Sequence, residues 1–408
     1  MVYACDIRYA ANPNPYVPGF FKCTTKPESS NSRSKWYVVE RGSSNSRWIR
    51  VAEIGASVVD NSDRMRSTLC AAGTWGLFIA SQYAPTLGSC GMNTVTAPLF
   101  APAPDWTGRD DGPGAEHARW HSEVSTNAEP HEGAVHLIGF ASDEGVERNG
   151  GRQGAAQGPD ALRAALGSLA IHHERTLIDA GTVTTQNDDL ETAQRTLSDK
   201  VYDLVTAQGA DGMTVVLGGG HETSFATHRG AYEAIGPMHI INFDAHFDLR
   251  TASRPTSGTP FRQIADLAGS DFDYSVFGIS QPNNTKVLFD TADDLGVTTV
   301  LDTELAEMSM REAVYRALAS VDGDLPIHLS IDLDVLPAAV APGVSAPAGF
   351  GVDYAKLRAM VSAVAATGRV ALLDVVELNP DFDVDNRTAK AAARLIDDAV
   401  TATAGRRR

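Results

Sequence analysis

The stretch PIHLSIDLDVL, residues 326–336, has the length and apolar character of a buried strand and carries two aspartates near its end. Two other stretches follow the same plan, MTVVLGGG at 213–220 before His221 and MHIINFDA at 238–245. Apolar, β-branched runs of this length are typical of strands buried on both faces of a parallel sheet. Polar side chains at the carboxyl ends of such strands lie where open α/β sheets place ligands. The sequence therefore predicts an α/β fold with a site at one edge of the sheet.

These three runs supply six side chains of metal-binding type, namely His221, Asp244, His246, Asp248, Asp332 and Asp334. In an extended chain, residues i and i+2 point to the same face, so we expect Asp244, His246 and Asp248 to converge. The same spacing brings Asp332 to Asp334. A single Asp-x-Asp is usually a loop or capping feature, but four carboxylates gathered without cations would repel one another and be costly to desolvate. The set is sufficient for two hard divalent cations with shared carboxylates, which predicts a hydrolase.

Strand and helix signals alternate from residue 135 to the end of the chain. Eight strands are expected, at 135–141, 175–181, 214–220, 239–245, 274–280, 297–303, 327–334 and 370–378. Helices are expected at 159–170, 190–208, 304–321, 353–366 and 385–404. Such alternation predicts a parallel sheet covered by helices on both faces. We therefore expect a three-layer α/β/α domain with an eight-stranded, mostly parallel sheet at 135–405, preceded by a lead-in segment at 92–134.

Residues 1–91 differ from the rest of the chain. Serine is dense, the string SSNSR occurs twice, and strand and helix signals do not alternate. All four cysteines lie in this stretch: Cys5, Cys23, Cys70 and Cys90. Two interpretations remain open, a disordered or regulatory extension or translated leader sequence upstream of a true start at Met92, and we favour the second. Peptides from residues 1–91 in a mass spectrum of the native protein would contradict it.

Composition excludes several classes of protein. The chain of 408 residues has a formal net charge of −17, and the acidic excess lies after residue 91. This charge argues against a nucleic-acid partner and favours a soluble, cytoplasmic protein. No apolar run reaches the roughly 18 residues of a membrane helix, and the N-terminus lacks a basic region followed by an apolar core. Without cysteine after Met92, a metal site in the body cannot use thiolates.

The motifs resemble those of the ureohydrolases, the family of arginase, agmatinase, guanidinobutyrase and formimidoylglutamase, over roughly residues 105–400. DAHFDLR at 244–250, SGTPFRQI at 257–264 and the glycine-rich string at 139–163 are most similar to formimidoylglutamase. The metal motifs are specific for the whole family, whereas these flanking strings separate its subgroups less sharply. The resemblance implies an arginase-like fold, a small-molecule substrate and a homo-oligomer.

The resemblance also implies roles for single residues. One Mn²⁺ would be held by His221, Asp244, Asp248 and Asp332, and the other by Asp244, His246, Asp332 and Asp334. Asp244 and Asp332 would bridge, and water between the ions would ionise near neutral pH. Asp248 would hydrogen-bond that hydroxide and relay its proton. Zn²⁺ or Fe²⁺ would also bind such atoms.

Glu377 in LLDVVELNP matches the family acid that receives a cationic guanidinium or amidinium, although a glutamate beside Asn-Pro also suits a helix or turn cap. Ser257 stands where arginases and agmatinases carry a histidine acid. The leaving-group proton must then come from Asp248 or water, with His228 as a speculative donor or simply a surface residue. The glycines of the 149–158 loop either shape the pocket mouth or form a flexible turn.

The implied substrate is N-formimidoyl-L-glutamate, cleaved to L-glutamate and formamide in histidine degradation. Its two carboxylates need cations, which Arg250, Arg254 and Arg262 are able to supply, since arginine binds carboxylate bidentately. We favour Arg250 because it follows Asp248 by two residues; a surface salt bridge is the alternative for each arginine. Two alternatives to this function remain: an agmatinase or guanidinobutyrase, which Ser257 and the arginines disfavour, and a catalytically silent metal-binding protein of the same fold.

Overall fold

The computed structural model describes residues 99–404 and three short strands nearer the N-terminus. Those strands, β1 (Phe20–Thr24), β2 (Ser34–Val38) and β3 (Ala52–Glu53), pair in an antiparallel sheet. The chain divides into two compact units, Met1–Thr96 and Ala97–Arg408. Most of residues 1–91 lie outside the described residues, so both interpretations of that stretch stay predictions.

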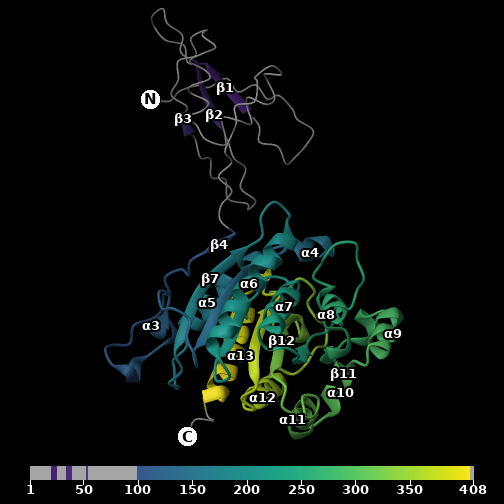
Figure 1. Ribbon diagram of the computed structural model, residues 1–408. Helices are drawn as coiled ribbons and strands as arrows, with labels where there is room; N and C mark the ends of the chain where they lie inside the picture. The colour runs from purple at the N-terminus through teal and green to yellow at the C-terminus, as the bar shows by residue number, and fades with distance from the viewer. Residues whose placement is uncertain (1–19, 25–33, 39–51, 54–98, 405–408) are drawn as a thin grey trace, which may run out of the picture. The chain divides into compact units, whose positions relative to one another are not determined.

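The second unit is built on a ten-stranded sheet (Figure 1). Its strands are β4 (Phe100–Ala101), β5 (Val124–Ser125), β6 (Val135–Ala141), β7 (Leu177–Thr184), β8 (Met213–Leu217), β9 (His239–Phe243), β10 (Asp273–Ile279), β11 (Thr298–Leu301), β12 (Ile327–Asp332) and β13 (Val370–Val376). The order is β11-β10-β9-β12-β13-β8-β6-β7-β4, and β5 also pairs with β7. Every pair is parallel except β4 with β7. All eight expected strands are present, and the segment expected to be a lead-in contributes β4 and β5.

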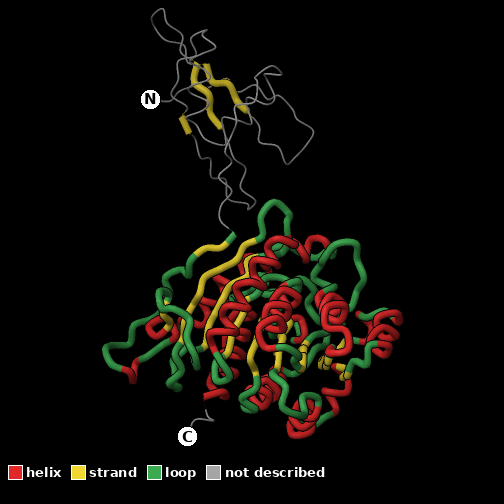
Figure 2. The backbone as a smooth tube through the Cα atoms, in the orientation of Figure 1, coloured by secondary structure: helices red, strands yellow, loops and turns green. Residues whose placement is uncertain are grey.

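Helices cover both faces of this sheet, as Figure 2 shows. They are α3 (Trp120–Glu123), α4 (Glu144–Arg148), α5 (Gly158–Gly167), α6 (Leu190–Gln208), α7 (Thr223–Ile235), α8 (Pro260–Ala268), α9 (Lys286–Asp294), α10 (Asp302–Glu307), α11 (Met310–Ala319), α12 (Tyr354–Ala365) and α13 (Arg387–Ala404). Alternate residues of β6 point to different layers. Val135 and Leu137 join a core with α5, α12 and α13, whereas Ile138 and Phe140 join one with α6 and α7. The predicted three-layer α/β/α fold is confirmed.

The prediction of one continuous helix at 304–321 is wrong, because the chain forms two helices there. α10 ends at Glu307 and α11 begins at Met310. The Ser309 hydroxyl accepts the N–H of Glu312, and the Glu312 carboxylate accepts the N–H of Ser309. This reciprocal capping box starts a new helix and satisfies N–H groups that would otherwise lack partners.

The four strands β9, β12, β13 and β8 are neighbours at the middle of the sheet. Because all four are parallel, their carboxyl ends meet at one edge. All of the predicted metal ligands and Glu377 follow these strand ends or lie in them. No helix in the part of the chain that the structure describes is long and apolar enough to cross a bilayer.

Candidate metal centre

Each predicted ligand lies at or just beyond the end of a central strand. His221 follows β8 after three glycines, and Asp244 comes directly after β9. Asp332 is the last residue of β12, and Asp334 lies in the 3-10 turn that follows. The sheet therefore gathers side chains that are separated by more than a hundred residues in the sequence.

The glycines before His221 are required by close packing. A Cβ atom on Gly219 would lie 1.9 Å from the carbonyl oxygen of Ser142, and one on Gly220 would lie 2.1 Å from the carboxylate of Glu222. Any side chain at these positions would push the segment away from the loop that follows β6. The glycines thus allow His221 to sit against the sheet edge.

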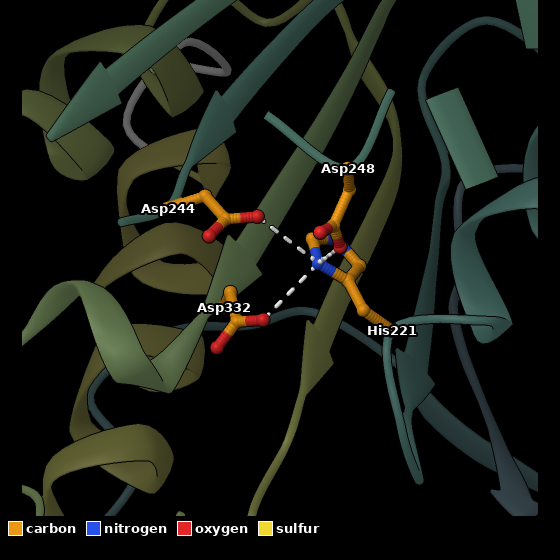
Figure 3. Close-up of side chains that lie close together, drawn as sticks. All are labelled: His221, Asp244, Asp248 and Asp332. Atoms are coloured by element: carbon orange, nitrogen blue, oxygen red, sulfur yellow. Dashed lines mark ion pairs between the residues drawn. The ribbon is translucent and has the colours of Figure 1, made fainter. Parts of the chain in front are cut away.

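Four ligand side chains form a first group, shown in Figure 3. The Nδ1 atom of His221 lies 3.1 Å from Asp244, 3.0 Å from Asp248 and 3.1 Å from Asp332, measured to one carboxylate oxygen of each. This nitrogen is buried and makes no hydrogen bond. Neighbouring ligand atoms of an octahedral ion with bonds of about 2.1 Å are roughly 3.0 Å apart. The spacing and the unpartnered nitrogen therefore fit a divalent cation.

A second group consists of Asp244, His246 and Asp334. The Nδ1 atom of His246 lies 3.0 Å from Asp334 and 3.6 Å from Asp244. Asp244 uses one oxygen toward each group, so it has the geometry of a bridge. Asp332, expected in both groups, is placed with the first only, and its other oxygen accepts the N–H of Asp334 at 2.8 Å.

The residues after β9 do not continue as a strand. β9 ends at Phe243, and Asp248 has a left-handed backbone with φ of 49°. His246 and Asp248 consequently diverge into different groups, and the expectation that they share one face of an extended chain is wrong. The turn, rather than the alternation of a strand, distributes these ligands between the two groups.

Negative charge is concentrated in these groups. Burial, together with Asp334 and Asp244, raises the pKa of Asp332 well above its ordinary value. Asp334 above all raises the pKa of His246 to about 12. Burial alone would lower the pKa of His221, but its three carboxylate neighbours raise it well above the ordinary value. Divalent cations would neutralise this excess of carboxylates.

Glu377 is held directly beside the first group. Its N–H donates to the carbonyl of Gly219 at 2.7 Å, and its carboxylate accepts the N–H of His221 at 2.9 Å. Burial and the neighbouring Glu222 raise the pKa of Glu377 to about 8. Like Asp248, it has a left-handed backbone, with φ of 67°.

Glu222 is a buried carboxyl that sequence reasoning missed, although it ends the string GGGHE. One of its oxygens accepts from the Ser142 hydroxyl at 2.8 Å and from the N–H of Gly145 at 3.0 Å. Burial raises its pKa to about 7. Glu222 therefore connects the His221 loop to the loop that follows β6.

Ser257 lies in the same connected region. Its N–H donates to the carbonyl of Gly145 at 2.9 Å, and its hydroxyl accepts from the amide of Asn149 at 3.1 Å. The structure thus links it to the loop that Glu222 holds, without bringing it into either ligand group.

The three arginines considered for substrate binding differ in their partners. Arg254 pairs with Glu191 at 3.2 Å, and Arg262 pairs with Asp266 at 3.0 Å. The guanidinium of Arg250 forms neither an ion pair nor a hydrogen bond with any residue between 99 and 404. It is also exposed. Of the three, Arg250 is the one whose charge is free for a ligand.

The 149–158 loop is fixed by specific hydrogen bonds. The amide of Asn379 donates to the carbonyls of Arg152 and Gln153 at 3.0 and 2.9 Å. The N–H of Gly154 donates to Asp143 at 2.7 Å. Asn379 follows Glu377 by two residues, so this loop is tied to the same edge of the sheet.

His228, considered as a proton donor or a surface residue, does not join the ligand groups. It is 2% exposed, lies in α7, and contacts His328 of β12 with 3.2 Å between their Nδ1 atoms. Burial and His328 lower its pKa well below the ordinary value. His328 was also missed by sequence reasoning, although HLSID alternates polar and apolar residues where a buried parallel strand is normally apolar on both faces.

Comparisons with known proteins identify relatives of this chain. The model of the Arginase family matches residues 133–401. Formimidoylglutamases from Corynebacterium efficiens and Rhodococcus jostii are each 50% identical to this chain. The first alignment covers 73% of this chain and 94% of the Corynebacterium protein, and the second covers 74% of this chain and 97% of the Rhodococcus protein. The structure is similar to that of Trypanosoma cruzi formiminoglutamase with Mn²⁺, with a TM-score of 0.61 and 30% identity over 67% of this chain and 94% of that one.

Proposed function

Because the chain belongs to the arginase family, we propose that it is a metal-dependent hydrolase acting on N-formimidoyl-L-glutamate. It cleaves the formimidoyl C–N bond with water and gives L-glutamate and formamide. The observation that carries the proposal is the pair of ligand groups that share Asp244, placed beside the buried carboxyl of Glu377. The formimidoylglutamase names of its relatives give the substrate.

Two Mn²⁺ ions per chain are the proposed cofactor. His221, Asp244, Asp248 and Asp332 would hold one ion, and Asp244, His246 and Asp334 would hold the other, with Asp332 as the further bridge that the family resemblance implies. When bound, the ions lower the pKa of a water molecule and so supply the nucleophile. Support for Mn²⁺ comes from the donor set, two imidazoles with several carboxylates, and from the metal named for the Trypanosoma cruzi structure.

The residues of the chain itself then orient the substrate and move a proton. Glu377 binds the cationic formimidoyl group as an anion, because the positive charges of the substrate and of the bound ions offset the burial and the Glu222 carboxyl that raise its pKa. Asp248 takes a proton from the attacking water. The amidine carbon gains the water oxygen and loses the glutamate nitrogen, which leaves as an amine after it receives a proton. Arg250 binds a substrate carboxylate bidentately. Ser257, held by Gly145 and Asn149, is also a proposed substrate-binding residue.

Arg250, which has no ion-pair partner among the residues that the structure describes, favours this substrate over agmatine. Agmatine carries positive charge at both ends, whereas formimidoylglutamate presents two carboxylates to the outer part of the site. The guanidinium of Arg250 attracts the carboxylates of formimidoylglutamate and repels the positive charge of agmatine.

The proposed setting of the enzyme is a cytoplasmic homo-oligomer.

A substrate panel tests the proposal. The full chain, loaded with Mn²⁺, is incubated in separate reactions with formimidoylglutamate, agmatine and guanidinobutyrate, and glutamate, formamide and urea are measured. We expect glutamate and formamide in equal amounts from the first compound and no urea from the others. Urea from agmatine would contradict the choice of substrate, and no product from any compound would favour a catalytically silent protein.

A further inference from the structure

One face of strand β12 is polar although the strand is wholly buried. His328, Ser330 and Asp332 alternate with Ile327, Leu329 and Ile331, and the apolar three belong to the core beneath α11, α12 and α13. The polar three face the opposite layer, where Ser224 and His228 of α7 contact Ser330 and His328. Buried polar groups are costly unless each is hydrogen-bonded. The row therefore needs a complete set of partners.

That set runs from the first ligand group into the core. The Nε2 atom of His221 lies 3.1 Å from the hydroxyl of Ser330, and Ser330 donates to one oxygen of Asp374 on β13. The other oxygen of Asp374 accepts from Thr227 and from the Nε2 atom of His328, both at 2.8 Å. A metal ligand, a serine and a buried carboxylate thus form one continuous chain of contacts.

The contacts determine where the protons lie. The Nδ1 atom of His221 faces the three carboxylates of the first group, so it supplies the lone pair to a metal and Nε2 carries the hydrogen. Nε2 then donates to Ser330, which donates in turn to Asp374. The hydroxyl of Ser224, 3.2 Å from that of Ser330, completes the set as a donor to Ser330. Each hydrogen in this assignment has an acceptor.

We propose that Ser330 and Asp374 are positioning residues that hold His221 in the ring orientation and tautomer that a metal requires. Partners of this kind fix metal-bound histidines and make them more basic, and losing one typically weakens metal binding by about 10- to 100-fold. The inference rests on the metal site of the proposed function and is independent of the substrate. A wild-type chain that binds two ions but leaves formimidoylglutamate intact would overturn the substrate assignment alone.

The test compares Ser330→Ala with Thr227→Val on the full chain. Thr227→Val removes a hydrogen bond to the same carboxylate, with nearly unchanged volume, but it leaves the path from Asp374 to His221 intact. Mn²⁺ affinity is measured by competition with a chromogenic chelator, and thermal stability is measured in the absence of metal. We expect Ser330→Ala to lower the Mn²⁺ affinity of one of the two binding steps by about 10- to 100-fold. Thr227→Val should lower stability and leave both steps within a few-fold of wild type.

Two results would overturn the inference. One is wild-type Mn²⁺ affinity in Ser330→Ala, and the other is an equal loss of affinity in Thr227→Val, which would mean that the whole buried network matters and not its path to His221. Ser330→Cys is the second variant, for use if alanine prevents folding. It is close to serine in volume but offers only a weak acceptor to His221, so the same loss of affinity is expected.

Discussion

Two acidic residues of the site, one in the first ligand group and one beside it, have backbones in the left-handed region. Asp248 and Glu377 are two of six non-glycine residues with positive φ in residues 99–404. Such conformations cost on the order of 1–3 kcal/mol each and persist where the surroundings hold them. Glu377 is held on both sides, by Gly219 at its N–H and by His221 at its carboxylate. We infer that the strain serves to aim both carboxyl groups at the site.

The identity of the ligand side chains is predicted by the residue pattern itself, whereas their division into two groups was predicted only by the family resemblance. GGGHE, DAHFD and SIDLD indicate His221, Asp244 and Asp332 because imidazoles and carboxylates cluster after apolar runs. The division of His246 and Asp248 between two groups depends on the turn after Phe243, which has no simple sequence signal. The sequence pattern did not predict a role for Ser330 or Asp374, because a single serine or aspartate inside an apolar run gives no indication of the residues that it contacts in the fold.

Substitution of Arg250 tests the proposed carboxylate site. Arg250→Ala should raise KM for formimidoylglutamate by about ten- to hundredfold, because a hydrogen bond to a charged group contributes about 1.5–3 kcal/mol. Arg262→Ala is the matched control, since Arg262 pairs with Asp266 on the surface of α8. It should leave KM unchanged. Steady-state kinetics in which both variants, or neither, alter KM would contradict the assignment.

At the scale of elements, strands were more predictable than helix boundaries. A buried strand such as Met213–Leu217 is indicated by its nearly continuous apolar character, and all eight expected strands formed. The helix expected at 304–321 failed because a capping box between Ser309 and Glu312 outweighs the continuous helical pattern. β4 and β5 are only two residues long, too short for any periodicity to indicate them.

Strand β6 gives a prediction about pH. Burial lowers the pKa of His136 to about 4, from an ordinary value of 6.5. Between pH 6.5 and about 4, His136 is therefore protonated in the unfolded chain but neutral in the folded chain. Its contribution to the free energy of unfolding is present above pH 6.5 and is lost as the pH falls toward 4. We expect the drop in Tm between pH 7 and pH 5 to be larger for wild type than for His136→Gln. Equal drops in thermal melts would contradict the prediction.

At the scale of the whole molecule, strand order creates the site. β8 and β9 are consecutive in sequence, but β12 and β13 lie between them in the sheet. This insertion brings the ends of four parallel strands together and places Asp332, Asp334 and Glu377 between His221 and Asp244. Strand order depends on how the helices pack over both faces, so the alternation of strands and helices predicts the three layers without predicting this order.

Metal content is the measurement that tests the central claim most directly. The full chain is loaded with Mn²⁺, dialysed, and analysed for bound metal by mass spectrometry, together with His246→Ala. Two ions per chain are expected for wild type, because Asp244 serves both groups. One ion is expected for the variant, since His246 belongs to the second group only. A single ion per chain in wild type, or none, would contradict the account.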